Sequence, residues 1–391
     1  MRTTPGKRRG QVGLTLSAIP SAVSFRVIRS PHDTPAVLVC YSKNAALNPE
    51  WRNAGYRSDL ARIRCATLQA AGHRLAHSQS YTGRMHRSPV VCRPARQLLS
   101  ALILPFVFTS FAHGWGNEGH RLINRLAAST LPSDAPGFLR SAEAVEEIEY
   151  LGPEPDRWRS HAEAELNAAQ APEHFIDLEP ADALGPLPRN RLDFEAKVFA
   201  AGQRPEKIGL QPWEAIEVWE RLKAALRAYR AESAAGHNTR PVEEAAIFYA
   251  GWLGHYVGDA SQPLHTTIQY NGWVGTNPNG YTTAHTIHWQ FEGSFVGANI
   301  QAAQVAPAMT PPHAIDGDMF DAYVAYLRHT ATYVEKVYQL EKAGGFVGAG
   351  SPESRDFTAA RLAAGASMLR DMVYSAWLES AKPVPDPYAG K

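Results

Sequence analysis

The chain has 391 residues, with 39 Lys and Arg against 38 Asp and Glu, and a net charge of +1 at pH 7. Residues 1–114 hold 16 basic and 3 acidic residues, so the remaining 277 hold 39 − 16 = 23 basic and 38 − 3 = 35 acidic, a net charge of −12. The negative charge of residues 115–391 argues against a long basic surface for nucleic acid in that part of the chain. All three cysteines lie in residues 1–114, so residues 115–391 cannot form a disulfide among themselves.

The first predicted element is a secretory signal peptide at residues 85–114. Residues 98–112 are almost uninterruptedly apolar or small, follow several arginines and lead to Gly114. Such a pattern is typical of an export signal. A transmembrane helix would need about 20 apolar residues without the interruption at Pro105. We therefore expect cleavage after Gly114 and a secreted or periplasmic protein.

A signal peptide is expected at the start of a chain, but residues 1–84 precede this one. They are Arg-rich and show no clear helical or strand period. Met85 is a suitable start for the leader. We therefore expect residues 1–84 to be a non-native upstream extension of the reading frame or a dispensable presequence.

Helical periodicity dominates after residue 114 and predicts an all-α domain over residues 115–391. Apolar residues recur at helical spacing in segments 118–130, 212–233, 241–260, 318–343 and 354–380. Segment 241–260 is apolar nearly all round, which predicts a buried central helix. Only 173–179, "EHFIDLE", alternates as a strand does. Long loops are expected at 178–211 and 266–284.

Two histidine–carboxylate pairs carry the first chemistry. His255 and Asp259 are four residues apart in segment 241–260, and His288 and Glu292 repeat the spacing downstream. Residues at i and i+4 share one helix face. A buried carboxylate without a partner is costly, so the pairs predict metal ligands of the kind that bind zinc.

Single histidines nearby extend or compete with these pairs. His265 lies just past Pro263, where the preceding helix must have ended. His285 competes with His288, but the residue four positions after it is Trp289, which cannot bind a metal.

The order of these motifs resembles the zinc-dependent S1/P1 nuclease family, which shares its helical fold with bacterial zinc phospholipase C. "WGNEGH" places His120 five residues after Trp115, and "HYVGDASQPLH" carries His255, Asp259 and His265 at the family's spacing. The resemblance implies one helical domain of the phospholipase C/P1 nuclease type, with a trinuclear zinc site in a cleft. It also implies that the amine and carbonyl of Trp115 bind zinc, which requires removal of the leader.

The resemblance implies nine ligands for three zinc ions. It assigns Asp156, His174, His255 and Asp259 to the first ion, Trp115, His120 and Asp259 to the second, and His265, His288 and Glu292 to the third. Asp156, Asp259 and Arg159 are the implied catalytic residues. By the same resemblance, zinc at the two sites that share Asp259 would activate a water molecule for attack on phosphorus, and Arg159 would neutralise charge on the phosphoryl oxygens. A surface ion pair is the alternative role for this arginine.

The "HFID" motif carries the implied substrate contacts. Phe175 would stack on a nucleobase and Asp177 would bind its edge, which favours unpaired strands. Alternatively, Phe175 packs in the core and Asp177 orients a zinc-bound histidine.

Some residues depart from the nuclease pattern. The expected Gly-Gly-Asn motif is replaced by "NGWVGTNPNGYTTAHT", Pro155 stands beside Asp156 in place of the usual tryptophan, and Glu292 has the phospholipase form. The loop with Trp273 and Tyr281 would border either a base pocket or a lipid-facing rim.

The sequence thus predicts an exported zinc-dependent hydrolase of phosphate esters. The expected substrates are single-stranded DNA, RNA or nucleotides, cut by a single-strand-preferring endonuclease and 3′-nucleotidase to 5′-phosphate products. A phospholipase C acting on phosphatidylcholine-type lipids is the alternative, and an exported zinc-binding protein without turnover is a third. No obligate protein partner is inferred.

Overall fold

The computed structural model describes residues 23–27, 38–42 and 115–384. The chain divides into two units, Met1–Leu102 and Ile103–Lys391. In the first, β1 (Val23–Val27) and β2 (Leu38–Ser42) pair antiparallel. The expectation of no strand period is wrong here, because β1 reads VSFRV, an alternation of apolar and polar residues. The rest of the expected upstream extension and the signal peptide at 85–114 lie outside the described residues.

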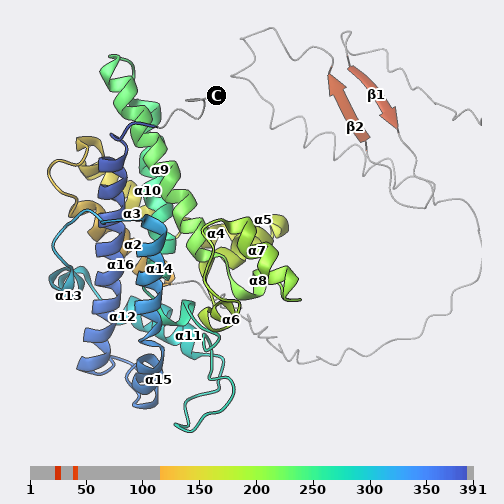
Figure 1. Cartoon of the computed structure of the whole chain (residues 1–391), viewed down its shortest axis with the longest axis vertical. Coiled ribbons are helices and arrows are strands. Elements are labelled where there is room, and N and C mark those ends of the chain that lie inside the picture. The colour runs from red at the N-terminus through yellow and green to blue at the C-terminus, as the bar shows by residue number, and fades with distance from the viewer. Residues whose placement is uncertain (1–22, 28–37, 43–114, 385–391) are drawn as a thin grey trace, which may run out of the picture. The chain divides into compact units, whose positions relative to one another are not determined.

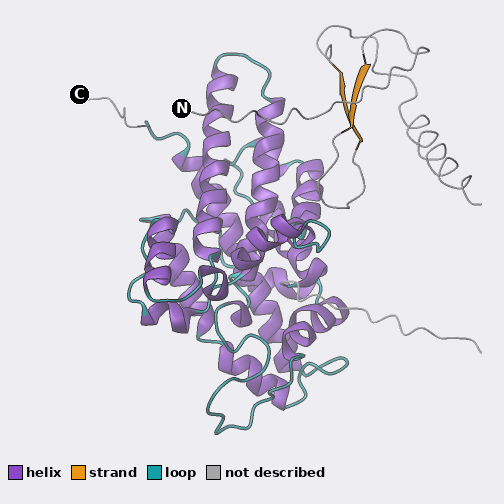
Figure 2. Ribbon diagram, turned by 90° about the vertical axis from the view of Figure 1, so that its right-hand side faces the viewer, coloured by secondary structure: helices purple, strands orange, loops and turns teal. Residues whose placement is uncertain are grey.

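The second unit is helical, and no β-strand occurs within residues 115–384 (Figure 2). The all-α prediction is therefore confirmed. Its α-helices are α2 (Gly116–Ser129), α3 (Ala142–Leu151), α4 (Glu154–Trp158), α5 (Ala164–Gln170), α6 (Leu178–Ala183), α7 (Arg191–Ala200), α8 (Pro205–Ile208), α9 (Gln211–Ala234), α10 (Arg240–Asp259), α11 (Ile287–Trp289), α12 (Val296–Asn299), α13 (Ala302–Val305), α14 (Met319–Ala331), α15 (Val334–Lys342) and α16 (Pro352–Glu379).

Shorter turns connect these helices. The 3₁₀ turns are η2 (Gly137–Arg140), η3 (Ala171–His174), η4 (Pro263–His265) and η6 (Ala306–Ala308), and η5 (Gln290–Phe295) is a π-helix. A π-helix is rare and frequently marks a functional site. None of the described helices is both long and apolar enough to cross a bilayer.

A bundle of long helices forms the core. Helix α10 packs against α2, α3, α9 and α16, which run beside one another in Figure 1. The predicted central position of segment 241–260 is confirmed, since the second half of α10 is buried almost without interruption. The proline at the first turn of α9, and of α16, suits a helix start because its missing N–H is not needed there.

Asn124 holds three of these helices together. Its side-chain amide donates to Ile148 O of α3 at 2.8 Å and to Gly251 O of α10 at 2.9 Å. Gly254 makes the approach possible, because a Cβ at this position would lie 1.9 Å from Asn124 Oδ1. The polar contact therefore fixes where α2 crosses α10, and α2 carries one end of the site described below.

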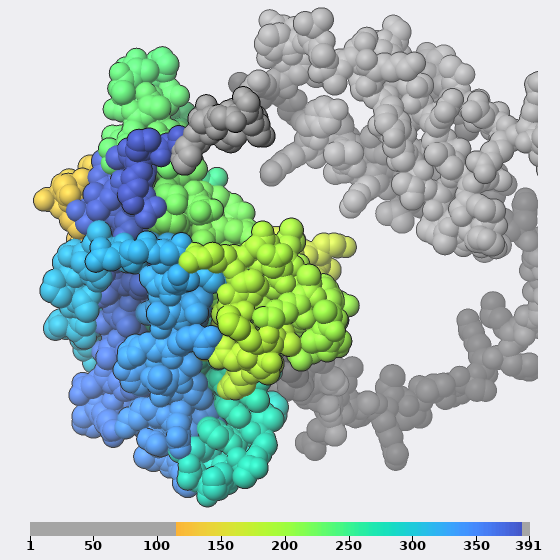
Figure 3. Space-filling model, in the orientation of Figure 1, coloured from red at the N-terminus to blue at the C-terminus, as the bar shows by residue number. Residues whose placement is uncertain are grey.

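The segment 178–211, expected as a long loop, instead contains α6, α7 and α8. The strand expected at 173–179 is also absent: His174 ends η3, and Leu178 begins α6. The short extended stretch between them bonds to η4 and the residue after it, with Ile176 N donating to His265 O and Leu178 N to Thr266 O. In Figure 3 the yellow-green segment forms a lobe beside the blue C-terminal helices, and Arg328 joins the two by a bidentate ion pair with Asp182.

Two other predictions concern the later chain. The expected loop at 266–284 is confirmed as free of helix. The single helical pattern at 318–343 is divided into α14 and α15, which are interrupted at Thr332 and Tyr333.

Candidate metal centre

The last turn of α10 carries the centre of the site. Asp259 Oδ2 lies 3.3 Å from His255 Nε2 on the same helix, and Asp259 Oδ1 lies 3.4 Å from His120 Nε2 of α2. All three side chains are fully buried. Gly258 allows this approach, since a Cβ there would lie 3.0 Å from His120 Nδ1. The three side chains form one group in which their ligand atoms could share a metal ion.

A second group surrounds Asp156 on the short helix α4. Asp156 Oδ1 lies 3.6 Å from His174 Nε2 and 4.0 Å from His255 Nε2, and these three residues could also share an ion. Arg159 Nη1 lies 3.4 Å from the same carboxylate oxygen, with about a quarter (26%) of its side chain exposed. The arginine therefore pairs with a buried carboxylate at the site and keeps part of its surface open to solvent.

The third group contains His265, His288 and Glu292. Glu292 Oε2 lies 3.0 Å from His288 Nε2 and 3.4 Å from His265 Nε2. His265 also lies 3.6 Å from Asp259 through its Nδ1 atom. Asp259 thus lies within 3.6 Å of a histidine from each of the three groups.

Backbone carbonyls orient four of the histidines. The Nδ1 atoms of His174, His255, His265 and His288 lie 2.7–3.0 Å from the carbonyl oxygens of Gln170, Gly152, His174 and Tyr270, respectively. A carbonyl can only accept, so each Nδ1 carries a proton and Nε2 is the atom left to bind a metal ion. This is the arrangement that metal-binding histidines adopt.

The donor set suits a cation. Several buried atoms have no hydrogen-bond partner: both oxygens of Asp259, Oε1 of Glu292, and the Nε2 atoms of His120, His174 and His255. Buried carboxylates of this kind are stable only when paired or bound to metal. The residues therefore fit zinc, which takes imidazole nitrogen and carboxylate oxygen.

Burial and neighbouring charges shift the pKa values of three residues in the site. Burial, assisted by Arg159, holds the pKa of His174 well below its usual value, so this imidazole is neutral. Burial alone would lower the pKa of His265, but the Asp259 and Glu292 carboxylates outweigh it and raise that pKa to about 9. Burial likewise opposes ionisation of Glu292, yet His288 and His265 lower its pKa to about 2. In the absence of an ion, the buried carboxylates thus draw positive charge onto a histidine.

Trp115 lies at the edge of this centre, immediately before α2. Its indole is fully buried and donates to Gly258 O at 2.8 Å and to Ser261 Oγ at 2.7 Å. Its carbonyl oxygen accepts the Gly119 N–H at 3.2 Å. The side chain is therefore anchored beside Asp259, and metal binding by the Trp115 amine stays a prediction.

The two predicted substrate residues follow His174. Phe175 is half-buried and Asp177 is buried. Burial, with Glu179 nearby, raises the pKa of Asp177 to about 7. Because four histidines have backbone carbonyls as Nδ1 partners, orienting them does not require Asp177.

Tyr281 belongs to the buried core and Trp273 packs partly buried against it, and their place beside a base pocket or a lipid-facing rim stays a prediction. Tyr281 is buried, and both rings pack on Tyr338, with centroids 5.1 Å and 5.6 Å from it. Between His265 and Glu292 in the sequence, the large apolar side chains that are exposed are Ile268, Tyr270, Val274 and Trp289.

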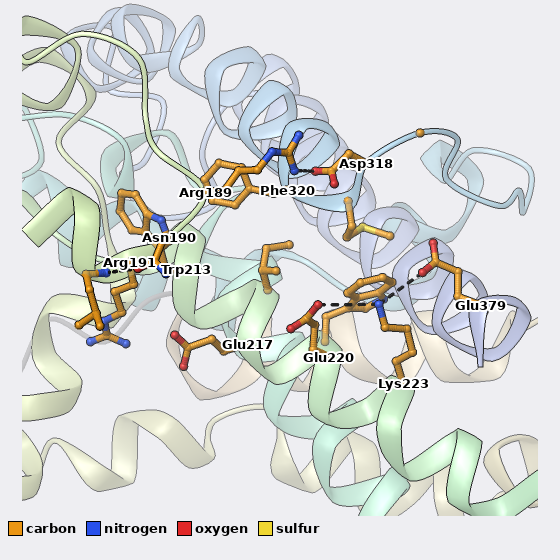
Figure 4. A pocket seen from close by; sticks show the side chains of 15 residues that line it. Arg189, Asn190, Arg191, Trp213, Glu217, Glu220, Lys223, Asp318, Phe320 and Glu379 are labelled. Carbon is orange, nitrogen blue, oxygen red and sulfur yellow. Dashed lines mark hydrogen bonds and ion pairs between the residues drawn. The ribbon is translucent and has the colours of Figure 1, made fainter. Parts of the chain in front are cut away.

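Larger cavities lie outside the three groups in the described part of the chain. One, of about 510 Å³, is lined by Thr266, which follows His265, and by Glu179 and Trp273. Another, of about 680 Å³, lies where α9, α14 and α16 meet (Figure 4). Its Lys223 pairs with Glu379 at 3.4 Å and its Arg189 pairs with Asp318, so these cations are already neutralised.

Comparison with known proteins assigns the chain to a family. The model of the S1/P1 nucleases matches residues 115–348, more than half of the chain. The protein belongs to the S1/P1 nuclease family. The family is zinc-dependent and hydrolyses phosphodiesters, so this S1/P1 nuclease family member is a phosphate-ester hydrolase whose three buried His/carboxylate groups could bind metal.

Two solved structures are similar to this family member over most of its length. One is the alpha-toxin of Clostridium perfringens from an avian strain, with 14% identity, a TM-score of 0.34 and coverage of 72% of this chain and 68% of that one. The other is the alpha-toxin of Clostridium absonum, with 13% identity, a TM-score of 0.32 and coverage of 71% and 67%. No curated protein sequence matches the chain.

Proposed function

We propose that this protein is an exported zinc-dependent phosphodiesterase that cleaves single-stranded DNA or RNA, acting as an endonuclease and 3′-nucleotidase with 5′-phosphate products. The observation that carries the proposal is the convergence of three buried groups on Asp259 inside the part of the chain that matches the S1/P1 nucleases.

We assign three zinc ions to these groups. Asp156, His174, His255 and Asp259 hold the first, Trp115, His120 and Asp259 the second, and His265, His288 and Glu292 the third. Zinc bound there supplies Lewis-acid chemistry, since it polarises a phosphoryl oxygen and makes water more acidic.

The chain's own residues bind and orient the substrate. Arg159 gives only a long contact of 3.4 Å to Asp156 and is partly exposed, so its other N–H groups can bind a phosphoryl oxygen. Phe175 offers a half-buried ring for stacking, and Asp177 offers a carboxyl group that can bind a base edge. A base held in this way must be unpaired.

The test is an assay of protein that begins at Trp115, on single-stranded DNA, RNA and phosphatidylcholine micelles, with and without a zinc chelator. We expect chelator-sensitive cleavage of nucleic acid and no release of phosphocholine. Nucleic acid left intact in the presence of zinc would overturn the proposal. Where nucleic acid is cleaved, F175A and D177N should raise KM for it, because both residues are assigned to the base.

A phospholipase C is the second candidate, and one observation favours it. No Lys or Arg occurs between residues 241 and 327, a stretch that holds five of the nine assigned ligands. In this stretch Tyr270, Val274 and Trp289 are about half exposed, at 51%, 56% and 41%. A stretch with exposed apolar side chains and no cation of its own suits a zwitterionic lipid better than a chain of phosphates. Phosphocholine release without nucleic-acid cleavage would support this candidate.

Export is part of the proposal. The signal peptide at 85–114 would be removed after Gly114, which frees the amine of Trp115 for zinc and places the enzyme outside the cytoplasm. N-terminal sequencing of protein isolated from its native source should read WGNEGH, whereas any peptide from residues 1–84 would contradict the proposed start.

A further inference from the structure

Gln262 lies between two of the proposed ligands and uses both ends of its amide. It is fully buried on the turn between α10 and η4, after Asp259 and before His265. Its Nε2 donates to Glu292 Oε2 at 2.8 Å, and its Oε1 accepts the Leu264 N–H at 2.6 Å. A residue outside every proposed ligand set thus contacts the carboxylate of the third group.

These partners fix the orientation of the amide. The backbone N–H of Leu264 can only donate, so the amide oxygen must face it. A carboxylate can only accept, so the amide nitrogen must face Glu292. Turning the amide over would break both bonds and leave two acceptors facing each other inside the protein.

Glu292 depends on tertiary contacts for its position. It lies in the π-helix η5, on a different part of the chain from Gln262, and is fully buried. Its Oε2 atom receives the Gln262 amide and faces His288 and His265, while its Oε1 atom has no hydrogen-bond partner. The amide therefore fixes one oxygen of the carboxylate and leaves the other available to a cation.

We propose that Gln262 is a positioning residue, which holds the Glu292 carboxylate for a metal ion in the group with His265 and His288. Outer partners of this kind commonly change metal affinity by about 10- to 100-fold when they are removed. The proposal rests on zinc binding by this group, as in the proposed function, and does not depend on which phosphodiester is cleaved.

The test is Gln262→Glu, which keeps the size of the side chain and an oxygen for Leu264 N–H but replaces the donor that faces Glu292 with an acceptor. Zinc content is measured by mass spectrometry after dialysis against graded chelator. We expect the variant to lose one zinc ion at a chelator concentration about 10- to 100-fold lower than the concentration at which the parent loses it.

Gln211→Glu is the matched control. Gln211 is also buried, and its amide donates to Tyr256 O and Tyr323 Oη, both at 2.6 Å, without touching a proposed ligand side chain. We expect this variant to keep all its zinc. Equal zinc loss in both variants, or full retention in Gln262→Glu, would overturn the positioning role.

A second variant covers the case in which Gln262→Glu does not fold. Gln262→Met fills the same space without polar atoms, and the same selective loss of one ion is expected. A parent protein that binds no zinc would instead refute the proposed metal centre, an outcome separate from any failure of Gln262.

Discussion

The indole of Trp115 and the hydroxyl of Ser261 are joined by a buried hydrogen bond of 2.7 Å. Ser261 lies two residues after Asp259, and the same indole also donates to Gly258 O at 2.8 Å. The first residue of the matched domain is therefore fixed to the turn that carries the central carboxylate.

Replacing Trp115 with Phe tests this anchor. The variant leaves two buried acceptors without the indole donor, so we expect the free energy of unfolding to fall by about 1–3 kcal/mol. Urea titration measures the change. Trp377→Phe is the control, because its indole donates to Asp134 O at an exposed site, and a loss there equal to that of Trp115→Phe would contradict the buried anchor.

Asp259→Asn should affect more than one metal group. Asp259 contacts His120, His255 and His265 within 3.6 Å, and removal of its charge weakens the attraction for every ion nearby. We expect loss of more than one zinc ion and a fall in phosphodiesterase activity on the order of 100-fold or more. Asp318→Asn is the control, because Asp318 forms an exposed pair with Arg189, and this variant should keep its zinc and its activity. If Asp259→Asn kept all its zinc, Asp259 would not serve more than one metal group.

Gly254→Ala should destabilise the bundle strongly. The new Cβ would lie 1.9 Å from Asn124 Oδ1 and 2.7 Å from Leu369 Cδ2, so α2 and α10 must separate or lose the Asn124 contacts. Overpacking of this kind costs about 1–3 kcal/mol or more. Gly137→Ala is the control, because a Cβ there meets nothing within 4 Å. Similar melting temperatures for the two variants would show that the close approach is unimportant.

The buried pair Glu173 and Glu214 should make stability depend on pH. Arg191 Nη2 lies 3.0 Å from Glu173 and its Nη1 lies 3.3 Å from Glu214. Burial and the nearby charge of Glu214 raise the pKa of Glu173 to about 8, and burial also raises the pKa of Glu214. The folded protein then holds a proton that the unfolded chain releases once the pH exceeds the ordinary glutamate pKa of 4.5.

Stability should therefore fall as pH rises from about 5 towards 8, because the folded state binds more protons in this window. Glu214→Gln removes one of the two negative charges and should flatten the fall. Urea unfolding at pH 5 and pH 8 compares parent and variant. An equally steep fall in Glu214→Gln would rule out this pair as its source.

The sequence predicts the local parts of the site well. Helical spacing indicates α2, α9, α10 and α16, and the i, i+4 rule places His255 beside Asp259 because both lie on one regular helix. It fails at 173–179, where alternating residues suggest a strand but the backbone instead bonds to the turn around His265. The sequence analysis also misses Gln262, although this residue lies between the predicted ligands Asp259 and His265.

By itself, the sequence determined which residues could bind a metal ion, since residue type and short-range spacing decide what a helix face can bind. Only the tertiary structure decided that His120, His265 and Asp259 meet at one point. Their contact depends on small residues such as Gly254 and Gly258, which allow α2 to approach α10, and on the turn at η4. Close packing between distant segments depends on the shapes of both partners, and no local pattern records that fit.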